Sequence, residues 1–219
     1  MERKNNNADV AGVIVEKATY SHSCKGEKFY RTVIESARLS GTIDKIPMVF
    51  SEKLAKAEEI VPGINISVYG EFRSRNKTCR DGKHRLFLFL FAEEIDLENG
   101  GEYNKVFLDG FLCKKPVFRE TPGGRRVADI ILAVNRPVNK SSYIPCICWG
   151  RNAVYASYME PGDNLQVIGR IQSRQYIKKF EDGKSYERTA YEVSISDMKF
   201  VEEGNTSDEE NSDIKEHEA

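Results

Sequence analysis

The sequence predicts an all-β protein made of two tandem copies of one small domain, followed by an acidic tail. Three observations predict this class: sequence landmarks recur at a nearly constant separation, runs of β-branched and aromatic residues alternate with turn residues, and the last stretch has almost no apolar side chains. With 219 residues, of which 40% are hydrophobic, the chain has enough apolar material for one large or two small domains.

Six landmarks define the repeat, and each lies 98 or 99 residues after its first occurrence. They are Gly12 with Gly110, Arg38 with Arg136, Ile46 with Ile144 and Pro47 with Pro145 at 98, then Pro62-Gly63 with Pro161-Gly162 and Gly70–Arg75 with Gly169–Arg174 at 99. A near-constant offset over this many positions indicates a duplicated domain. The predicted division is a flexible segment over 1–9, copy 1 over 10–98, a joint at Asn99-Gly100-Gly101, copy 2 over 104–201 and a disordered tail over 202–219.

The periodicity within each copy predicts five short strands and one helix. In copy 2 the strands are expected at Val106–Leu112, Val127–Val134, Tyr143–Trp149, Asn164–Arg174 and Tyr186–Met198. A short helix is expected over Arg151–Met159, where Pro161-Gly162 ends it, and the matching helix of copy 1 is expected over Glu52–Ile60. Five strands with a helix after the third is the element order of the OB-fold, a partly open barrel that often binds oligonucleotides.

Charge is distributed unevenly along the chain. The tail over 202–219 holds eight acidic residues against Lys215 alone, so it cannot form a core and is expected to be disordered. Residues 1–103 balance at 16 basic and 16 acidic residues, whereas residues 104–201 hold 16 basic and 10 acidic. Copy 2 is therefore a basic domain, as expected of a protein that binds phosphates.

Four segments of copy 2 resemble successive signatures of the bacterial single-stranded DNA-binding proteins, in matching order and spacing. They are Leu132-Ala133-Val134-Asn135-Arg136, Ile144–Trp149, Gly169–Tyr176 and Tyr191-Glu192-Val193. The resemblance extends to copy 1 mainly through the internal repeat. It implies a protein that coats and protects single-stranded DNA, without sequence preference, during replication, repair or recombination in the cytosol or nucleoid of a bacterium.

Binding of this kind needs cations for phosphates and flat side chains on which bases stack, at roughly 1–3 kcal/mol per base. Period-two alternation places Tyr143 and Trp149 on one face of their strand and Cys146 and Cys148 on the other. On the next strand one face carries Arg170, Gln172, Arg174 and Tyr176. The resemblance implies that bases stack on Tyr143, Trp149 and Tyr176, although tyrosine is also a common strand residue and charges usually lie on solvated faces.

Further candidate DNA-binding cations of copy 2 are Arg125, Arg126, Arg136 and Arg151. Each of them alone could be ordinary surface charge, but together they contribute to the positive balance of this half.

Copy 1 departs from the pattern at the stacking positions. The offset matches Tyr143 with Lys45, Trp149 with Ser51, Tyr176 with Lys77 and Arg170 with Glu71, so all three rings are lost and one cation is reversed. Candidate auxiliary contacts remain at Arg38, Arg73, Arg75 and Lys77, and rings elsewhere are available at Tyr20, Phe29 and Tyr30. Copy 1 is accordingly predicted to be architectural or a weak auxiliary site.

No enzymatic or cofactor site is predicted. The five cysteines contain no C-x-x-C pair, the three histidines are dispersed, and neither a phosphate-binding loop nor a nucleophile motif is present. No run of apolar residues is long enough for a membrane helix, and Met1–Asp9 lacks the apolar core of a signal peptide. We therefore expect a non-catalytic cytosolic protein without metal or cofactor.

The resemblance also implies partners. Family members usually combine four OB-folds, so a homodimer of this chain is expected. Their acidic tails end in an apolar tip that docks into replication and repair enzymes, whereas this chain ends Glu216-His217-Glu218-Ala219 without such a tip. The tail could therefore compete with DNA for the basic groove or only aid solubility. Two other functions stay open: an OB-fold module for protein assembly, or an RNA-binding paralogue, because stacking surfaces distinguish the two sugars poorly.

Overall fold

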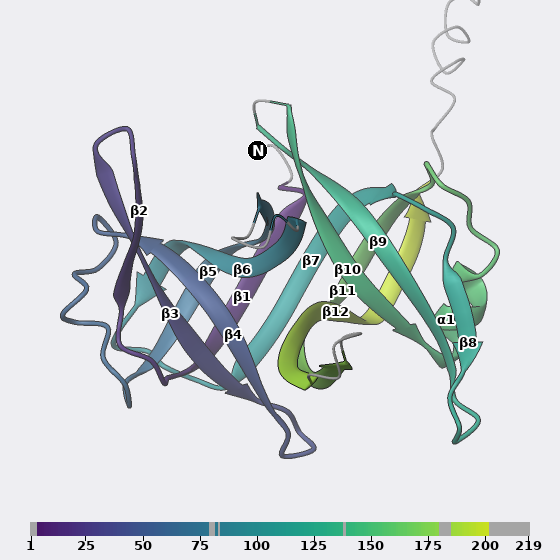
Figure 1. The fold of residues 1–219 in the computed structure, drawn as a ribbon, viewed down its shortest axis with the longest axis horizontal. Coiled ribbons are helices and arrows are strands. Elements are labelled where there is room, and N and C mark those ends of the chain that lie inside the picture. The colour runs from purple at the N-terminus through teal and green to yellow at the C-terminus, as the bar shows by residue number, and fades with distance from the viewer. Residues whose placement is uncertain (1–3, 79–81, 83, 138, 180–184, 202–219) are drawn as a thin grey trace, which may run out of the picture.

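The computed structural model describes residues 4–78, 82, 84–137, 139–179 and 185–201. These form two β-barrels that lie side by side (Figure 1) and share a 12-stranded sheet of order β2-β3-β4-β6-β5-β1-β7-β11-β12-β10-β9-β8. Copy 1 consists of β1 (Asn6–Ile14), β2 (Thr19–Cys24), β3 (Glu27–Ala37), β4 (Ile43–Ser51), β5 (Asn65–Thr78) and β6 (His84–Asp96). Residues 97–102 lead into copy 2.

Copy 2 repeats this order and adds a helix. Its elements are β7 (Tyr103–Leu112), β8 (Val117–Glu120), β9 (Arg126–Arg136), β10 (Lys140–Trp149), α1 (Gly150–Ala156), β11 (Asn164–Lys179) and β12 (Ser185–Val201). The OB-fold prediction is thus confirmed, with the five expected strands present. The short edge strands β8 and β2 were missed because neither has a buried residue: β8 is four exposed residues long, and β2 is mostly polar.

The helix prediction is correct in copy 2 and wrong in copy 1. Residues 52–60 form two separate turns, in which the amides of Leu54 and Glu59 donate to the carbonyls three residues before them. A side chain bonds a backbone amide within each turn: Ser51 Oγ accepts from the Lys53 amide at 3.1 Å, and Glu59 Oε2 accepts from the Lys56 amide at 3.0 Å. Such local side-chain bonds compete with helical bonds, so the segment does not extend into a helix.

The two copies are joined by antiparallel pairing of β1 with β7. Six consecutive residue pairs run from Asn6 with Leu108 to Ala11 with Tyr103. The sequence predicted a flexible segment over residues 1–9, and for residues 6–9 this is wrong, because they form the part of β1 that pairs with β7 and β5. A polar, Asn-rich stretch gave no sign of this pairing.

One asparagine in each copy, on β1 and on β7, makes the same pair of hydrogen bonds to the backbone. The side chain of Asn6 bonds both the amide and the carbonyl of Phe72, at 3.0 and 2.8 Å, and Asn104 does the same to Ile171, at 2.8 and 2.7 Å. Asn104 follows Asn6 by 98 residues and Ile171 follows Phe72 by 99, so the duplication has preserved the contact. The bonds satisfy backbone groups that the sheet leaves unpaired beside the joint.

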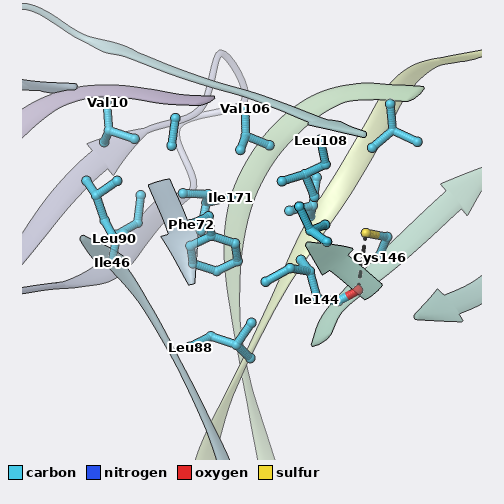
Figure 2. Close-up of a cluster of buried hydrophobic side chains, with 14 of the residues drawn as sticks. Val10, Ile46, Phe72, Leu88, Leu90, Val106, Leu108, Ile144, Cys146 and Ile171 are labelled. Carbon is cyan, nitrogen blue, oxygen red and sulfur yellow. Dashed lines mark hydrogen bonds between the residues drawn. The ribbon is translucent and has the colours of Figure 1, made fainter. Parts of the chain in front are cut away.

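The hydrophobic core is continuous between the copies. Figure 2 shows Val10, Phe72 and Leu90 of copy 1 in one cluster with Val106, Leu108, Ile144 and Ile171 of copy 2. Most of these side chains are fully buried. Because the copies share a core as well as a strand pair, their relative orientation is fixed, and both outer faces are held in one frame.

We call each of these asparagines, with its two backbone bonds, an asparagine clamp, and removing one is expected to destabilise the protein. Asn104→Ala leaves the amide and the carbonyl of buried Ile171 without partners, which costs about 1–3 kcal/mol in the free energy of unfolding. Urea unfolding followed by circular dichroism measures this loss. Asn76→Ala, on the exposed end of β5, is the matched control and should change the free energy by less than about 0.5 kcal/mol. Equal effects of both changes would show that the clamp contributes nothing.

Candidate nucleic-acid interface

Strand β10 presents its aromatic rings outward and its thiols inward. Tyr143 is 46% and Trp149 38% exposed, while Cys146 and Cys148 are buried. Burial raises the pKa of the Cys148 thiol to about 12 and that of Cys146 well above its ordinary value. Both thiols therefore stay protonated and unreactive, and the strand offers its chemistry only through the rings.

Trp149 lies at the edge of a basic depression. Its Nε1–H donates to Ser194 Oγ of β12 at 3.2 Å, which fixes the edge of the ring. An open depression of about 590 Å³ is lined by Trp149 together with Gly124, Arg125, Arg126 and Gly150. The two arginines come from the β8–β9 hairpin, whose tight turn is closed by the Gly124 amide bonding the Thr121 carbonyl at 2.8 Å. The structure thus brings together Trp149 and two of the predicted cations.

A second depression adjoins the first and carries two tyrosines that the sequence analysis missed. It is lined by Arg126, Gly150, Arg151, Val154, Tyr155 and Tyr158. Tyr155 is 46% and Tyr158 80% exposed, whereas Ala153 and Ala156 on the opposite side of α1 are buried. The i, i+3 spacing of the two tyrosines, on the face away from these alanines, was the available signal. Predicted Arg151 belongs to this surface.

The predicted basic ladder on β11 is exposed only at its far end. Arg174 and Tyr176 are exposed, and the Arg174 guanidinium lies 5.9 Å from the centre of the Tyr176 ring. Gln172 is buried and donates to Glu192 Oε1 at 2.7 Å. Arg170 turns toward copy 1, where it forms an ion pair with Asp44. The first half of the ladder is therefore occupied by protein contacts rather than open to a ligand.

Asp44 is a fully buried carboxylate at the contact between the copies. It accepts from Arg38 Nε at 2.9 Å and Nη2 at 2.7 Å, from Arg170, and from the Ser173 amide at 2.8 Å. Burial by itself raises the pKa of Asp44, but the bonds from Arg38 and Ser173 and the charges of both arginines outweigh it, so the pKa lies below its ordinary value. Arg38, a predicted auxiliary contact, thus holds Asp44.

The other auxiliary candidates lie on or near β5. Arg73 is partly buried and donates to Glu71 Oε2 at 2.6 Å, while Arg75 and Lys77 are exposed. Arg136 of copy 2 lies near this group: burial and the charge of Arg73 lower its pKa, against the effect of Glu71. At the position equivalent to Trp149, Ser51 is buried and donates to Glu27. The three lost ring positions therefore offer no stacking surface.

Among the described residues, no group of three or more His, Cys, Asp or Glu side chains is arranged to hold a metal ion. Within the same ranges, no helix has the length and apolar character needed to cross a membrane.

Comparison with known proteins agrees with this architecture. Residues 103–201 match the single-strand binding protein family. A single-stranded DNA-binding protein of Clostridium tetani is 39% identical over 109 residues, which cover 47% of this chain and 72% of the relative. Single-stranded DNA-binding protein 3 of Clostridium acetobutylicum is also 39% identical, over 47% of this chain and 74% of its own length.

A solved structure extends the likeness to both copies. The wild-type single-stranded DNA-binding protein of Thermus aquaticus superposes with a TM-score of 0.75 over 94% of this chain and 98% of its own, at 23% identity. Such a likeness establishes the shared two-barrel fold. The strand order and the likeness define a protein of two joined OB-folds. With the sequence match over copy 2, the chain belongs to the single-strand binding protein family.

The Asp44 cluster predicts an acid-sensitive contact between the copies. An unfolded aspartate titrates near pH 3.9, so the contribution of Asp44 to stability is complete above about that pH and is lost as pH falls through the lower pKa of the folded state. Asp44→Asn should remove this part of the acid dependence. It should also cost less at neutral pH than the roughly 3–5 kcal/mol of a fully buried pair, because Arg38 and Arg170 keep 24% and 30% exposure.

Urea unfolding of both proteins between pH 3 and 7 measures this difference. Asp129→Asn, which breaks the exposed pair with Arg119, is the control and should cost less than about 1 kcal/mol. An unchanged acid dependence in Asp44→Asn would contradict the assignment.

Proposed function

We propose that this protein binds single-stranded DNA without reading its sequence, and so protects exposed strands and keeps them from re-pairing. The observation that carries the proposal is the Trp149 ring beside Arg125 and Arg126, with Tyr143 outward on the same strand, in the half of the chain that matches the family. A base presents the same kind of π-face whatever its identity, so such a surface accepts any sequence.

The path of the strand follows from the arrangement of rings and cations. Bases stack on Trp149, Tyr143 and Tyr176, while Arg125, Arg126, Arg151 and Arg174 neutralise phosphates. Arg136 lies between the copies and continues the positive surface. Gln172, Arg170 and Arg38 act indirectly, because their bonds to Glu192 and Asp44 hold β11 and β4 in place.

The biological setting follows from this activity. Exposed strands arise in replication, repair and recombination, so these are the processes the protein would serve, in the cytosol or nucleoid. The chemistry is binding rather than catalysis, since stacking and ion pairing alone account for the surface. Four OB-folds would be assembled by a homodimer, which sedimentation would detect as twice the 24.9 kDa chain mass. The acidic segment 202–219 lies outside the described residues, and recruitment of repair proteins through it stays a prediction.

Loss of the Trp149 ring is expected to weaken binding. Trp149→Ala should reduce the free energy of binding to an oligo-dT strand by roughly 1–3 kcal/mol, the contribution of one stacked base, whereas Trp149→Phe should keep most of it. Anisotropy of a labelled oligomer measures the affinity in each variant. For the unaltered chain, log K should fall linearly with log salt, by about 0.7 per phosphate neutralised. Equal affinities for Trp149→Ala and the unaltered chain would remove Trp149 from the site.

A further inference from the structure

Copy 1 has its own row of aromatic rings on β6, at positions where β12 of copy 2 holds Ala190, Glu192 and Ser194. Along β6 the residues Leu88 and Leu90 are buried, whereas the alternate residues Phe87, Phe89 and Phe91 point to the other side. Phe87 is 46% exposed, and the other two rings are partly exposed. The core needs only the leucines, so packing does not explain three phenylalanines on the outer face.

Cations lie beside this row in register. The β5–β6 pairing sets Arg75 opposite Phe87, Arg73 opposite Phe89 and Glu71 opposite Phe91. The Arg73 guanidinium lies 3.7 Å from the centre of the Phe91 ring. Two carboxylates on these strands are paired with cations, Glu71 with Arg73 and Glu93 with Lys4 at 2.7 Å. The surface therefore combines rings with a positive charge at Arg75, which suits a polyanion with flat groups.

Two more rings extend the row across the sheet. The Phe29 ring of β3 lies 6.0 Å from Phe91, and His22 of β2 stacks on Phe29 with ring centres 4.9 Å apart and planes 9° from parallel. On β4, which lies between these strands, Ser51 is paired opposite Phe29 and Val49 opposite Phe91. We call Phe87, Phe89, Phe91, Phe29 and His22 the copy 1 aromatic strip.

The strip occupies the face that corresponds to the Trp149 surface of copy 2. The pairings Glu71 with Phe91 and Arg73 with Phe89 correspond to Arg170 with Ser194 and Gln172 with Glu192. Ser194 is the residue that receives the Trp149 Nε1–H bond. In copy 2 the ring is thus on β10 and the serine on β12, whereas in copy 1 the serine is Ser51 on β4 and the ring is Phe91 on β6. The ring and the serine have exchanged strands.

We propose that the copy 1 aromatic strip is a second binding surface for unpaired bases, so that both barrels of the chain contact the same strand. This rests on the proposed function and replaces the prediction that copy 1 is architectural or only weakly binding. Arg75 lies on the side of the strip toward the joint, where Arg136 of copy 2 is close to Arg73, and Arg75 and Arg136 lead the phosphates from one barrel to the other.

The test uses the full chain, in which Trp149 is the only tryptophan and therefore reports on copy 2 alone. The variant Phe87→Thr/Phe89→Thr removes two rings but keeps residues that favour strands. Its affinity for an oligo-dT long enough to span both barrels should fall by roughly 5- to 150-fold for each base that loses its stacking partner. The length of poly-dT covered per chain should also shorten, while quenching of Trp149 at saturation should be unchanged.

Controls separate stacking from folding. Phe87→Tyr/Phe89→Tyr keeps the rings and should bind like the unaltered chain, and Leu86→Ala, on the same strand, should do the same. If the double threonine variant loses its circular dichroism spectrum, His22→Ala, at the β2 end of the strip, takes its place and should shorten the covered length.

The outcomes distinguish this proposal from the proposed function. If the strip variants keep their affinity and covered length while Trp149 is still quenched, the strip proposal is overturned, the proposed function stands, and the face is better suited to a protein partner. If the unaltered chain shows neither quenching nor binding, the proposed function itself fails.

Discussion

The pairing of β1 with β7 is the constraint on which the rest of the structure depends. Each barrel would otherwise end in an open edge next to β5 or β11, with unpaired amides and carbonyls. Antiparallel pairing of six residues satisfies both edges at once and brings the two cores together. Because the pairing relates equivalent residues of the two copies, it creates an approximate two-fold axis within one chain, as a symmetric dimer interface would.

This approximate symmetry also shows where the copies have diverged. Ser74 Oγ accepts from the Tyr143 amide, and its equivalent Ser173 Oγ accepts from the Lys45 amide. The amides of the same serines donate to Ser142 in one contact and to Asp44 in the other. In the first contact the acceptor is the neutral Ser142 hydroxyl. In the second it is the buried Asp44 carboxylate, whose charge is balanced by two arginines. Arg38 and Arg170 are therefore structural residues in this contact, bound to Asp44.

The features that the sequence predicts well are those with local signals. The 98-residue offset revealed the duplication, and period-two alternation placed Trp149 outward and Cys148 inward. The features that the sequence did not predict depend on distant partners. Nothing near Arg170 in the sequence indicates that its partner is Asp44, 126 residues earlier. Asn6 likewise lies in a polar stretch whose strand pairing is with the other copy. The helix predicted in copy 1 is absent for a local reason. The side chains of Ser51 and Glu59 bond nearby amides, and helix propensity takes no account of this competition for the backbone.

The alternation Leu86-Phe87-Leu88-Phe89-Leu90-Phe91 is also visible in the sequence. A position-by-position match of the two copies does not reveal it as a stacking surface, because the rings of the two copies stand on different strands. A base contacts a face to which several strands contribute, so the two copies need not carry a ring at the same place on the same strand. In an OB-fold barrel β4, β5 and β6 present side chains to one outer face, so a ring lost from β4 or β5 can be replaced from β6. What duplication must preserve for stacking is therefore the face and its flanking cations, and the strand that supplies the ring is free to change.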